Sequence, residues 1–189
     1  MTYALITPPD AEPISLAELK AHLRVDGDGE DALLASLIRT ARGHLERTTG
    51  LALISQGWRL YLDCWPETGA VDIARGPVRS LDAVRAFDEF GEESEIPLAG
   101  HVLDGVRQPA RLWLGIGPVS RRAINGVEVD FTAGFGEAGE DVPDMLKRAM
   151  LIHAAHMYEF RGAVPLEMQP AGIPEGYDRL AAPFLMRRL

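Results

Sequence analysis

The sequence predicts an α+β protein in which a helical bundle of three to four helices carries an inserted small antiparallel β region and an extended C-terminal arm. Two long segments repeat apolar residues every three or four positions, as helices do. Between these segments the repeat changes to every second residue, which is typical of strands buried on one side. After the second helical segment the sequence becomes rich in Gly and Pro, which favours an extended chain.

Composition excludes several classes of protein. The chain has 189 residues, a net charge of −9 and one cysteine. A chain of this length buries roughly 70% of its unfolded surface, so its core needs neither disulfides nor a structural metal. The single Cys64 has no intramolecular partner, which indicates a reducing compartment such as the cytoplasm. No apolar run is long enough to span a membrane, and the acidic balance argues against a protein whose main task is to bind DNA phosphates.

The N-terminal segment, residues 1–55, is expected to be helical. Ser15 and Glu18 form the pattern of a capping box, in which two side chains satisfy free amides at a helix start. After an Asp- and Gly-rich connection, residues 30–49 place apolar side chains at helical spacing. Gly50 follows as a stop signal, so we expect a short helix and then a long one.

The segment 56–136 is expected to form the β insertion. Trp58, Leu60 and Leu62 alternate with other residues and therefore share one face of a strand. The acidic stretch 88–95 is interpreted as an exposed hairpin tip, because so many carboxylates cannot be buried unpaired. Further strands of a small antiparallel sheet or sandwich are expected at 71–73, 81–87, 101–103, 111–114 and 126–133.

The segment 137–162 is expected to be a long core helix that completes the helical bundle. It is apolar almost all round as far as Phe160, so it must be covered on more than one side. The helix at 30–49, the sheet and another subunit are all possible covers. The remaining residues, 163–189, form the predicted C-terminal arm, which includes a short helix at 175–182.

No residue pattern in the chain is typical of an enzyme. His153, His156 and Glu159 form H-x-x-H-x-x-E, which lacks the i, i+4 histidines of zinc proteases, so we interpret the histidines as packing residues and expect no metal. Cys64 is expected to be a packed thiol at a strand end. The chain contains no nucleophile elbow and no phosphate-binding glycine loop. We therefore expect no catalytic residue and no cofactor; a small cytosolic hydrolase with a site between helices and sheet is the alternative.

The end of the chain is unusually apolar for a segment that normally frays into water. Either it folds back on its own core, or it docks into a neighbouring protein. Arginine combined with an aromatic side chain is common at interface hot spots, which favours docking. The candidate docking residues are Arg179, Phe184, Leu185, Met186, Arg187, Arg188 and Leu189.

The order and spacing of several segments resemble the phage head-tail connector (adaptor) family found in tailed phages, prophages and gene transfer agents. The resemblance covers nearly the whole chain, although each segment alone is unspecific. The segments are 14–25, the 30–50 helix leading into 52–58, 129–136, 142–159 and 180–189.

This resemblance implies a non-enzymatic subunit that forms a ring of about twelve copies with itself. Such a ring lies between the portal protein and a stopper or tail-terminator-type neck protein, and double-stranded DNA passes through its lumen without specific binding. The C-terminal segment, from about 174 onward, is implied to contact the portal. The resemblance also implies assembly in the bacterial cytoplasm and a final place in the neck of the particle. The long β insertion is absent from the smallest connectors, so its contacts cannot be inferred from them.

Overall fold

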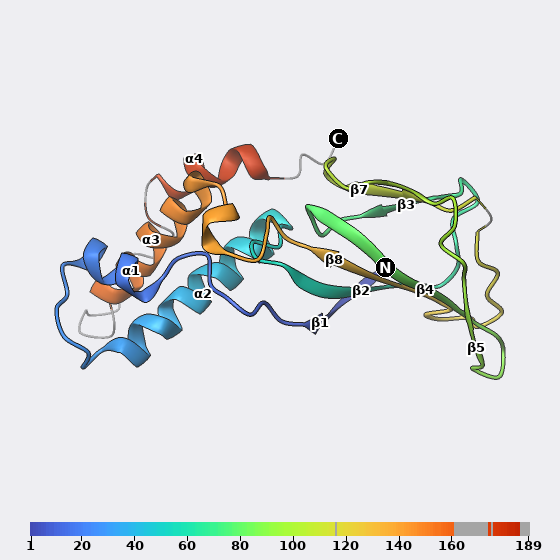
Figure 1. Ribbon diagram of the computed structural model, residues 1–189, viewed down its shortest axis with the longest axis horizontal. Helices are drawn as coiled ribbons and strands as arrows, with labels where there is room; N and C mark the ends of the chain where they lie inside the picture. The colour runs from blue at the N-terminus through green and yellow to red at the C-terminus, as the bar shows by residue number, and fades with distance from the viewer. Residues whose placement is uncertain (116, 161–173, 175, 186–189) are drawn as a thin grey trace. The chain divides into compact units, whose positions relative to one another are not determined.

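The computed structural model describes residues 1–115, 117–160, 174 and 176–185. Its contacts divide the chain into two units. Figure 1 labels their helices and strands and colours the chain from the N-terminus to the C-terminus. The β unit combines Met1–Asp10 with Ser55–Phe135. The helical unit combines Ala11–Ile54 with the described residues of Gly136–Leu189. The protein is therefore a mixed α+β protein with its strands in one unit and its helices in the other.

The first two helices begin and end where the sequence predicts. Helix α1 spans Leu16–Leu23, and the Glu18 amide donates to the Ser15 hydroxyl (3.1 Å) while the Ser15 amide donates to the Glu18 carboxylate (2.6 Å). This reciprocal pair is the expected capping box. Helix α2 spans Asp31–Thr49 and ends at Gly50, whose φ of 77° is accessible to glycine without strain.

The nearly apolar third helix is covered by other helices of the same chain. Helix α3 spans Asp144–Glu159, and α4 spans Tyr177–Ala181. Helix α2 packs along α3, while α1 contacts both and α4 contacts α3. Within the described residues, three helices thus cover α3, and apolar burial drives this packing. The buried side chains that meet there include Leu19, Leu34, Ile38, Ala41, Leu45, Leu146, Ala149, Met150 and Ala154.

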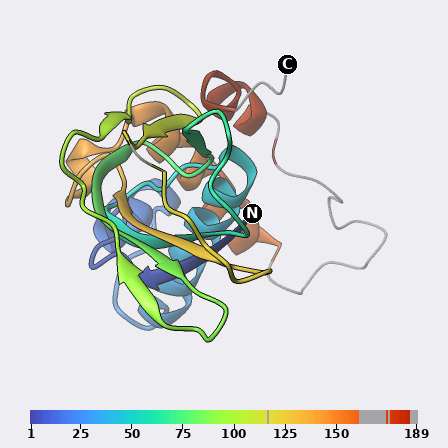
Figure 2. The same ribbon diagram turned by 90° about the vertical axis from the view of Figure 1, so that its right-hand side faces the viewer.

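The β unit contains two antiparallel sheets. The larger sheet has the strand order β1-β2-β8-β4-β5, and the smaller has the order β3-β7-β6. Figures 1 and 2 show the smaller sheet on one side of the larger one. The strands are β1 (Thr2–Thr7), β2 (Gln56–Leu62), β3 (Ala70–Ile73), β4 (Val78–Phe87), β5 (Glu93–Glu95), β6 (Val102–Asp104), β7 (Ala110–Trp113) and β8 (Val127–Ala133).

Strand register places the apolar residues of the larger sheet in one row. Leu60 of β2 pairs with Val129 of β8, which pairs with Val84 of β4, and all three are fully buried. Tyr3 of β1 pairs with Leu60 and extends this row to the edge of the sheet. The Tyr3 hydroxyl accepts a hydrogen bond from the Ala74 amide (2.8 Å), so the polar end of a largely buried ring is satisfied.

Two strands are absent from the sequence-based prediction. Strand β1 lies within the N-terminal segment that is expected to be helical, but its backbone pairs with β2 at the edge of the larger sheet. Strand β5 lies within the acidic stretch 88–95 and pairs with the end of β4, while its three side chains stay exposed. Both strands are held by backbone pairing, β1 to a partner far along the chain and β5 to the adjacent end of β4, so neither needs an alternating pattern of its own. The turn before β5 remains an exposed hairpin tip, as predicted.

Candidate functional site

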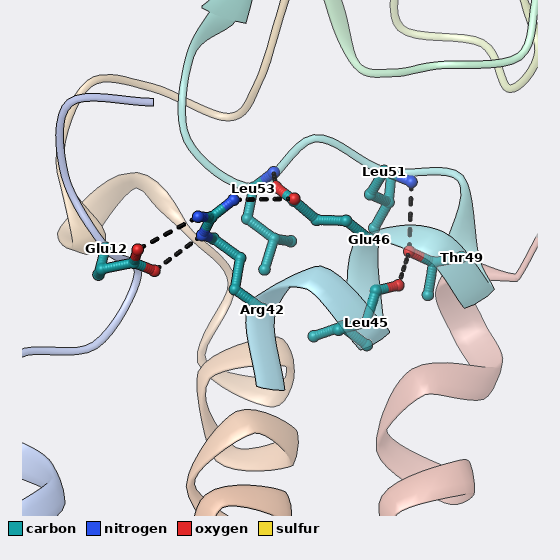
Figure 3. A network of polar contacts seen from close by, with 7 residues as sticks. All are labelled: Glu12, Arg42, Leu45, Glu46, Thr49, Leu51 and Leu53. Carbon is teal, nitrogen blue, oxygen red and sulfur yellow. Dashed lines mark hydrogen bonds and ion pairs between the residues drawn. The ribbon is translucent and has the colours of Figure 1, made fainter. Parts of the chain in front are cut away.

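A network of charged groups ties together three segments of the helical unit (Figure 3). Arg42 of α2 makes two bonds to the Glu12 carboxylate, at 2.7 and 3.2 Å, and a third to Glu46 at 3.1 Å. Glu46 is only 8% exposed, and its second oxygen accepts from the Leu53 amide at 2.9 Å. Paired and hydrogen-bonded charges of this kind are rigid. The network therefore fixes the chain just after residue 10 and just before residue 55, where the sequence passes between the two units.

The end of α2 is held by a second set of bonds in the same region. The Thr49 hydroxyl donates to the Leu45 carbonyl (2.7 Å) and accepts from the Leu51 amide (3.2 Å), as Figure 3 shows. The apolar segment 51–54 that follows is buried. Ile54 then forms an isolated β-bridge with Gly136. Because the Thr49 hydroxyl and the Leu51 amide have hydrogen-bond partners, burial of the segment 51–54 carries only a small desolvation penalty.

The beginning of the C-terminal segment folds onto its own helices. Tyr177 is 2% exposed and Ala181 is 3% exposed, so one face of α4 is covered. The Tyr177 ring lies edge-on to His44 of α2 and His153 of α3, with ring centroids 5.8 and 5.5 Å apart. For this portion of the segment the structure supports packing on the chain's own core.

The structure describes three of the candidate docking residues. One lies on the exposed side of α4, and the other two follow the end of that helix. Arg179 is exposed, Phe184 is half-buried, and Leu185 is 44% exposed. The exposed Leu185 directly follows a short 3-10 turn, Ala182–Phe184, that continues α4. The other candidates, Met186, Arg187, Arg188 and Leu189, lie outside the described residues.

A cluster of alternating charges covers the outer face of the larger sheet. Arg59 lies 2.8 Å from Glu128 and 2.6 Å from Asp130, and Arg85 also lies 2.6 Å from Asp130. Burial alone would raise the pKa of Asp130, but hydrogen bonds from the two arginines outweigh it and hold that pKa below its ordinary value. Sequence reasoning missed this cluster because strand pairing, not sequence proximity, brings its members together.

We expect Asp130→Asn to lower the free energy of unfolding by about 1 kcal/mol at pH 7. The pKa of Asp130 is lower in the folded chain than in the unfolded one, so its contribution is present above about pH 4 and is lost as the pH falls through the folded value. Urea unfolding at pH 7 and pH 3 measures this; the gap between variant and wild type should shrink at pH 3. Asp72→Asn, at a looser and more exposed pair, is the matched control. A gap of equal size at both pH values would contradict the prediction.

The residues considered for chemistry are dispersed or engaged in packing. The His153 ring contacts His44, the His156 ring contacts Phe160 at 4.8 Å, and Glu159 is exposed. Among the described residues, no three His, Cys, Asp or Glu side chains are grouped to hold a metal ion. Cys64 is exposed, contrary to the predicted packed thiol, because it lies in the bend that follows β2.

Two cavities, one in each unit, differ in the side chains that line them. A cavity of about 390 Å³ in the β unit is lined by apolar residues and glycines, including Ile96, Leu114 and Val119. A second cavity, in the helical unit, contains Glu18 and Lys147. The pKa of Glu18 is lowered by its bond to the Ser15 amide, and that of Lys147 is raised by its bond to Asp144. Both groups are already engaged in stabilising helix ends.

None of the helices among the described residues combines the length and the apolarity that crossing a membrane requires.

The chain is similar to known proteins both in sequence and in structure. The sequence profile of phage gp6-like head-tail connector proteins matches residues 13–96. A chain in the neck of an empty gene transfer agent (GTA) particle, solved with C6 symmetry, is 31% identical. Its TM-score is 0.83, and the alignment covers 100% of this chain and 97% of that one. The chain belongs to the phage gp6-like head-tail connector family.

Two further structures contain chains similar to this connector. One is the virion of a native GTA particle, with 31% identity and a TM-score of 0.83. The other is the neck of a native GTA particle solved with C12 symmetry, with 32% identity and a TM-score of 0.80. In both cases the alignment covers 100% of this chain and 97% of the other. No curated protein matches the connector.

These findings confirm the family expected from the sequence and a structural role as a connector. The family and the similar chains are structural proteins of particles, not enzymes. The mixed α+β architecture of the connector is also that of the similar neck chains.

Proposed function

We propose that the chain is an adaptor subunit in the neck of a phage-like particle, of the gene transfer agent type. About twelve copies form a ring between the portal protein and a stopper or tail-terminator-type neck protein. The supporting observation is the match over essentially the full length of chains found in GTA necks that were solved with C6 and C12 symmetry. The subunit assembles in the bacterial cytoplasm and takes its final place in the neck.

The charge of the subunit suits a passage for DNA. Each copy carries a net charge of −9, so a ring of copies creates a field that repels phosphate. DNA passes through such a lumen with little binding, because tight binding needs cationic side chains that displace counterions. A closed ring also needs a heterologous interface, in which one surface of a subunit meets a different surface of the next.

Portal contact is assigned to Arg179, Phe184 and Leu185, together with Met186, Arg187, Arg188 and Leu189. The packed Tyr177 and Ala181 support this assignment, because they hold the base of the segment in place. A tethered segment loses less conformational freedom on binding than a free one does. The exposed Leu185 can then be covered by the partner.

The test is to mix the purified chain with portal rings and image the product by electron microscopy. We expect a ring of subunits on the portal, and no ring without it, because the portal supplies the symmetry on which the subunits assemble. The same sample should retain no double-stranded DNA at about 0.1 M salt. A chain that stays monomeric beside the portal, or that binds DNA in a salt-sensitive manner, would overturn the proposal.

A further inference from the structure

Three aromatic rings from three helices meet at the base of the C-terminal segment. They are His44 of α2, His153 of α3 and Tyr177 of α4. Their centroids lie 4.9 Å (His44 to His153), 5.8 Å (His44 to Tyr177) and 5.5 Å (His153 to Tyr177) apart, and all three pairs are edge-to-face. Each ring therefore contacts the other two. Tyr177 is only 2% exposed, and its ring packs α4 against α2 and α3.

The imidazole of His153 is packed in a way that suits its neutral form. The Nε2 atom of His44 and the Nδ1 atom of His153 are buried and have no hydrogen-bond partner among the described residues. A neutral imidazole has one N–H donor, whereas a protonated one has two and carries a charge. Protonation in place would therefore bury a charge and add a donor where no acceptor lies, which is costly.

We propose that His44, His153 and Tyr177 form an acid-labile latch, which holds α4 against α2 and α3 at neutral pH and releases it when His153 is protonated. This inference concerns the chain alone and does not depend on the proposed function. In the released state the His153 ring is hydrated, and burial no longer opposes its positive charge.

The direction of the pH dependence follows from the groups that face the cluster. Burial, then the nearby His44 and His156, lowers the pKa of His153 from its ordinary 6.5 to about 4. On α4, burial and Asp178 raise the pKa of Tyr177, so this ring stays neutral in acid. Because the pKa of His153 is lower when docked than when released, docking is strongest above about pH 6.5 and weakens as the pH falls towards about 4. One proton taken up on release changes the docking equilibrium by about tenfold per pH unit.

Amide hydrogen exchange of the full chain, followed by NMR, tests the latch. The Leu180 amide donates to the Gly176 carbonyl (3.2 Å) and reports on α4, while the Leu34 amide of α2 (2.9 Å to the Glu30 carbonyl) is the internal reference. After correction for intrinsic exchange, we expect the protection of Leu180 to fall steadily between pH 6.5 and pH 4.5, and that of Leu34 to change little. Constant protection of Leu180 down to pH 4.5 would overturn the proposal.

Variants identify the groups responsible. In His44→Gln/His153→Gln no imidazole remains in the cluster, so the protection of Leu180 should no longer depend on pH; persistence of the wild-type pH profile would contradict the latch. His101→Gln, an exposed histidine of the β unit, is the matched control and should keep the wild-type profile. Titration of the wild-type histidine resonances needs no variant. An apparent pKa of His153 near 6.5 would refute the proposal even if the double variant failed to fold.

Discussion

We expect removal of residues 183–189 to abolish the attachment of tails to filled heads, while the melting temperature of the isolated protein should change by only about 2 °C. The truncated chain loses Phe184, Leu185 and the four residues after them, but it keeps Tyr177 and Ala181, which pack α4 onto the helical unit. Removal of the whole segment from residue 174 onward, which the family resemblance implies contacts the portal, is a poorer test. It also removes the buried Tyr177, so a loss of tail attachment would not distinguish lost docking from lost folding. Counting tailed particles by electron microscopy, together with thermal unfolding of the free chain, measures both effects.

A point variant separates docking from chain length. Leu185→Asp places a charge on a side chain that is 44% exposed in the free chain, so stability should hardly change. Tail attachment should still fall at least tenfold, because the charge would be buried against the portal. Val119→Asp makes a similar change at an apolar residue of the β unit that is 84% exposed, and it should attach normally. Normal attachment by both Leu185→Asp and the truncated chain would refute the docking role of the tail.

Arg42→Met should be the most destabilising of the substitutions considered, with a loss of about 3 kcal/mol in the free energy of unfolding. Arg42 is the cation that neutralises Glu12 and Glu46, and Glu46 is only 8% exposed. Methionine fills much of the same volume but removes the positive charge that Arg42 places beside the mostly buried Glu46 carboxylate. Urea unfolding at pH 7 measures the loss.

Two further variants check the cause of this loss. Arg39→Met, at an exposed position of the same helix, should change stability by less than about 0.5 kcal/mol. Glu46→Gln added to Arg42→Met should recover some of the loss, because the amide oxygen can still accept from the Leu53 amide but carries no charge. If the double variant were no more stable than Arg42→Met, the buried charge would not be the cause.

The elements that the sequence predicts well are those whose signals are local. The capping box at Ser15 and Glu18, the apolar spacing of α2 and the glycine at its end all lie within a few residues of the structure they produce. Strand β2 is predicted from its alternation and lies where expected. Strands β1 and β5 are not predicted, because their pairing partners lie far along the chain or carry no matching pattern.

The candidate site likewise has a part that the sequence predicts and a part that it does not. The apolar and arginine-rich composition of the C-terminal segment is visible in the sequence, and it points to Arg179, Phe184 and Leu185. In the sequence, the histidines at 153 and 156 stand out only as a pair on one helix. Their separate partners, His44 for one and Phe160 for the other, emerge only when α2, α3 and α4 pack together.

Periodicity, capping and composition act over short stretches of chain, so they predict an α+β protein with long helices, an inserted β region and an apolar chain end. The connector family was expected only from a resemblance in the order and spacing of several segments. Three features are visible only in the folded chain: residues 2–7 pair at the edge of the larger sheet, Arg42 bonds to Glu12 and Glu46, and Tyr177 packs against two histidines. These features are not visible in the sequence because hydrogen bonds, ion pairs and ring contacts act over a few ångströms in space. Which distant residues come within that range depends on the packing of the whole unit.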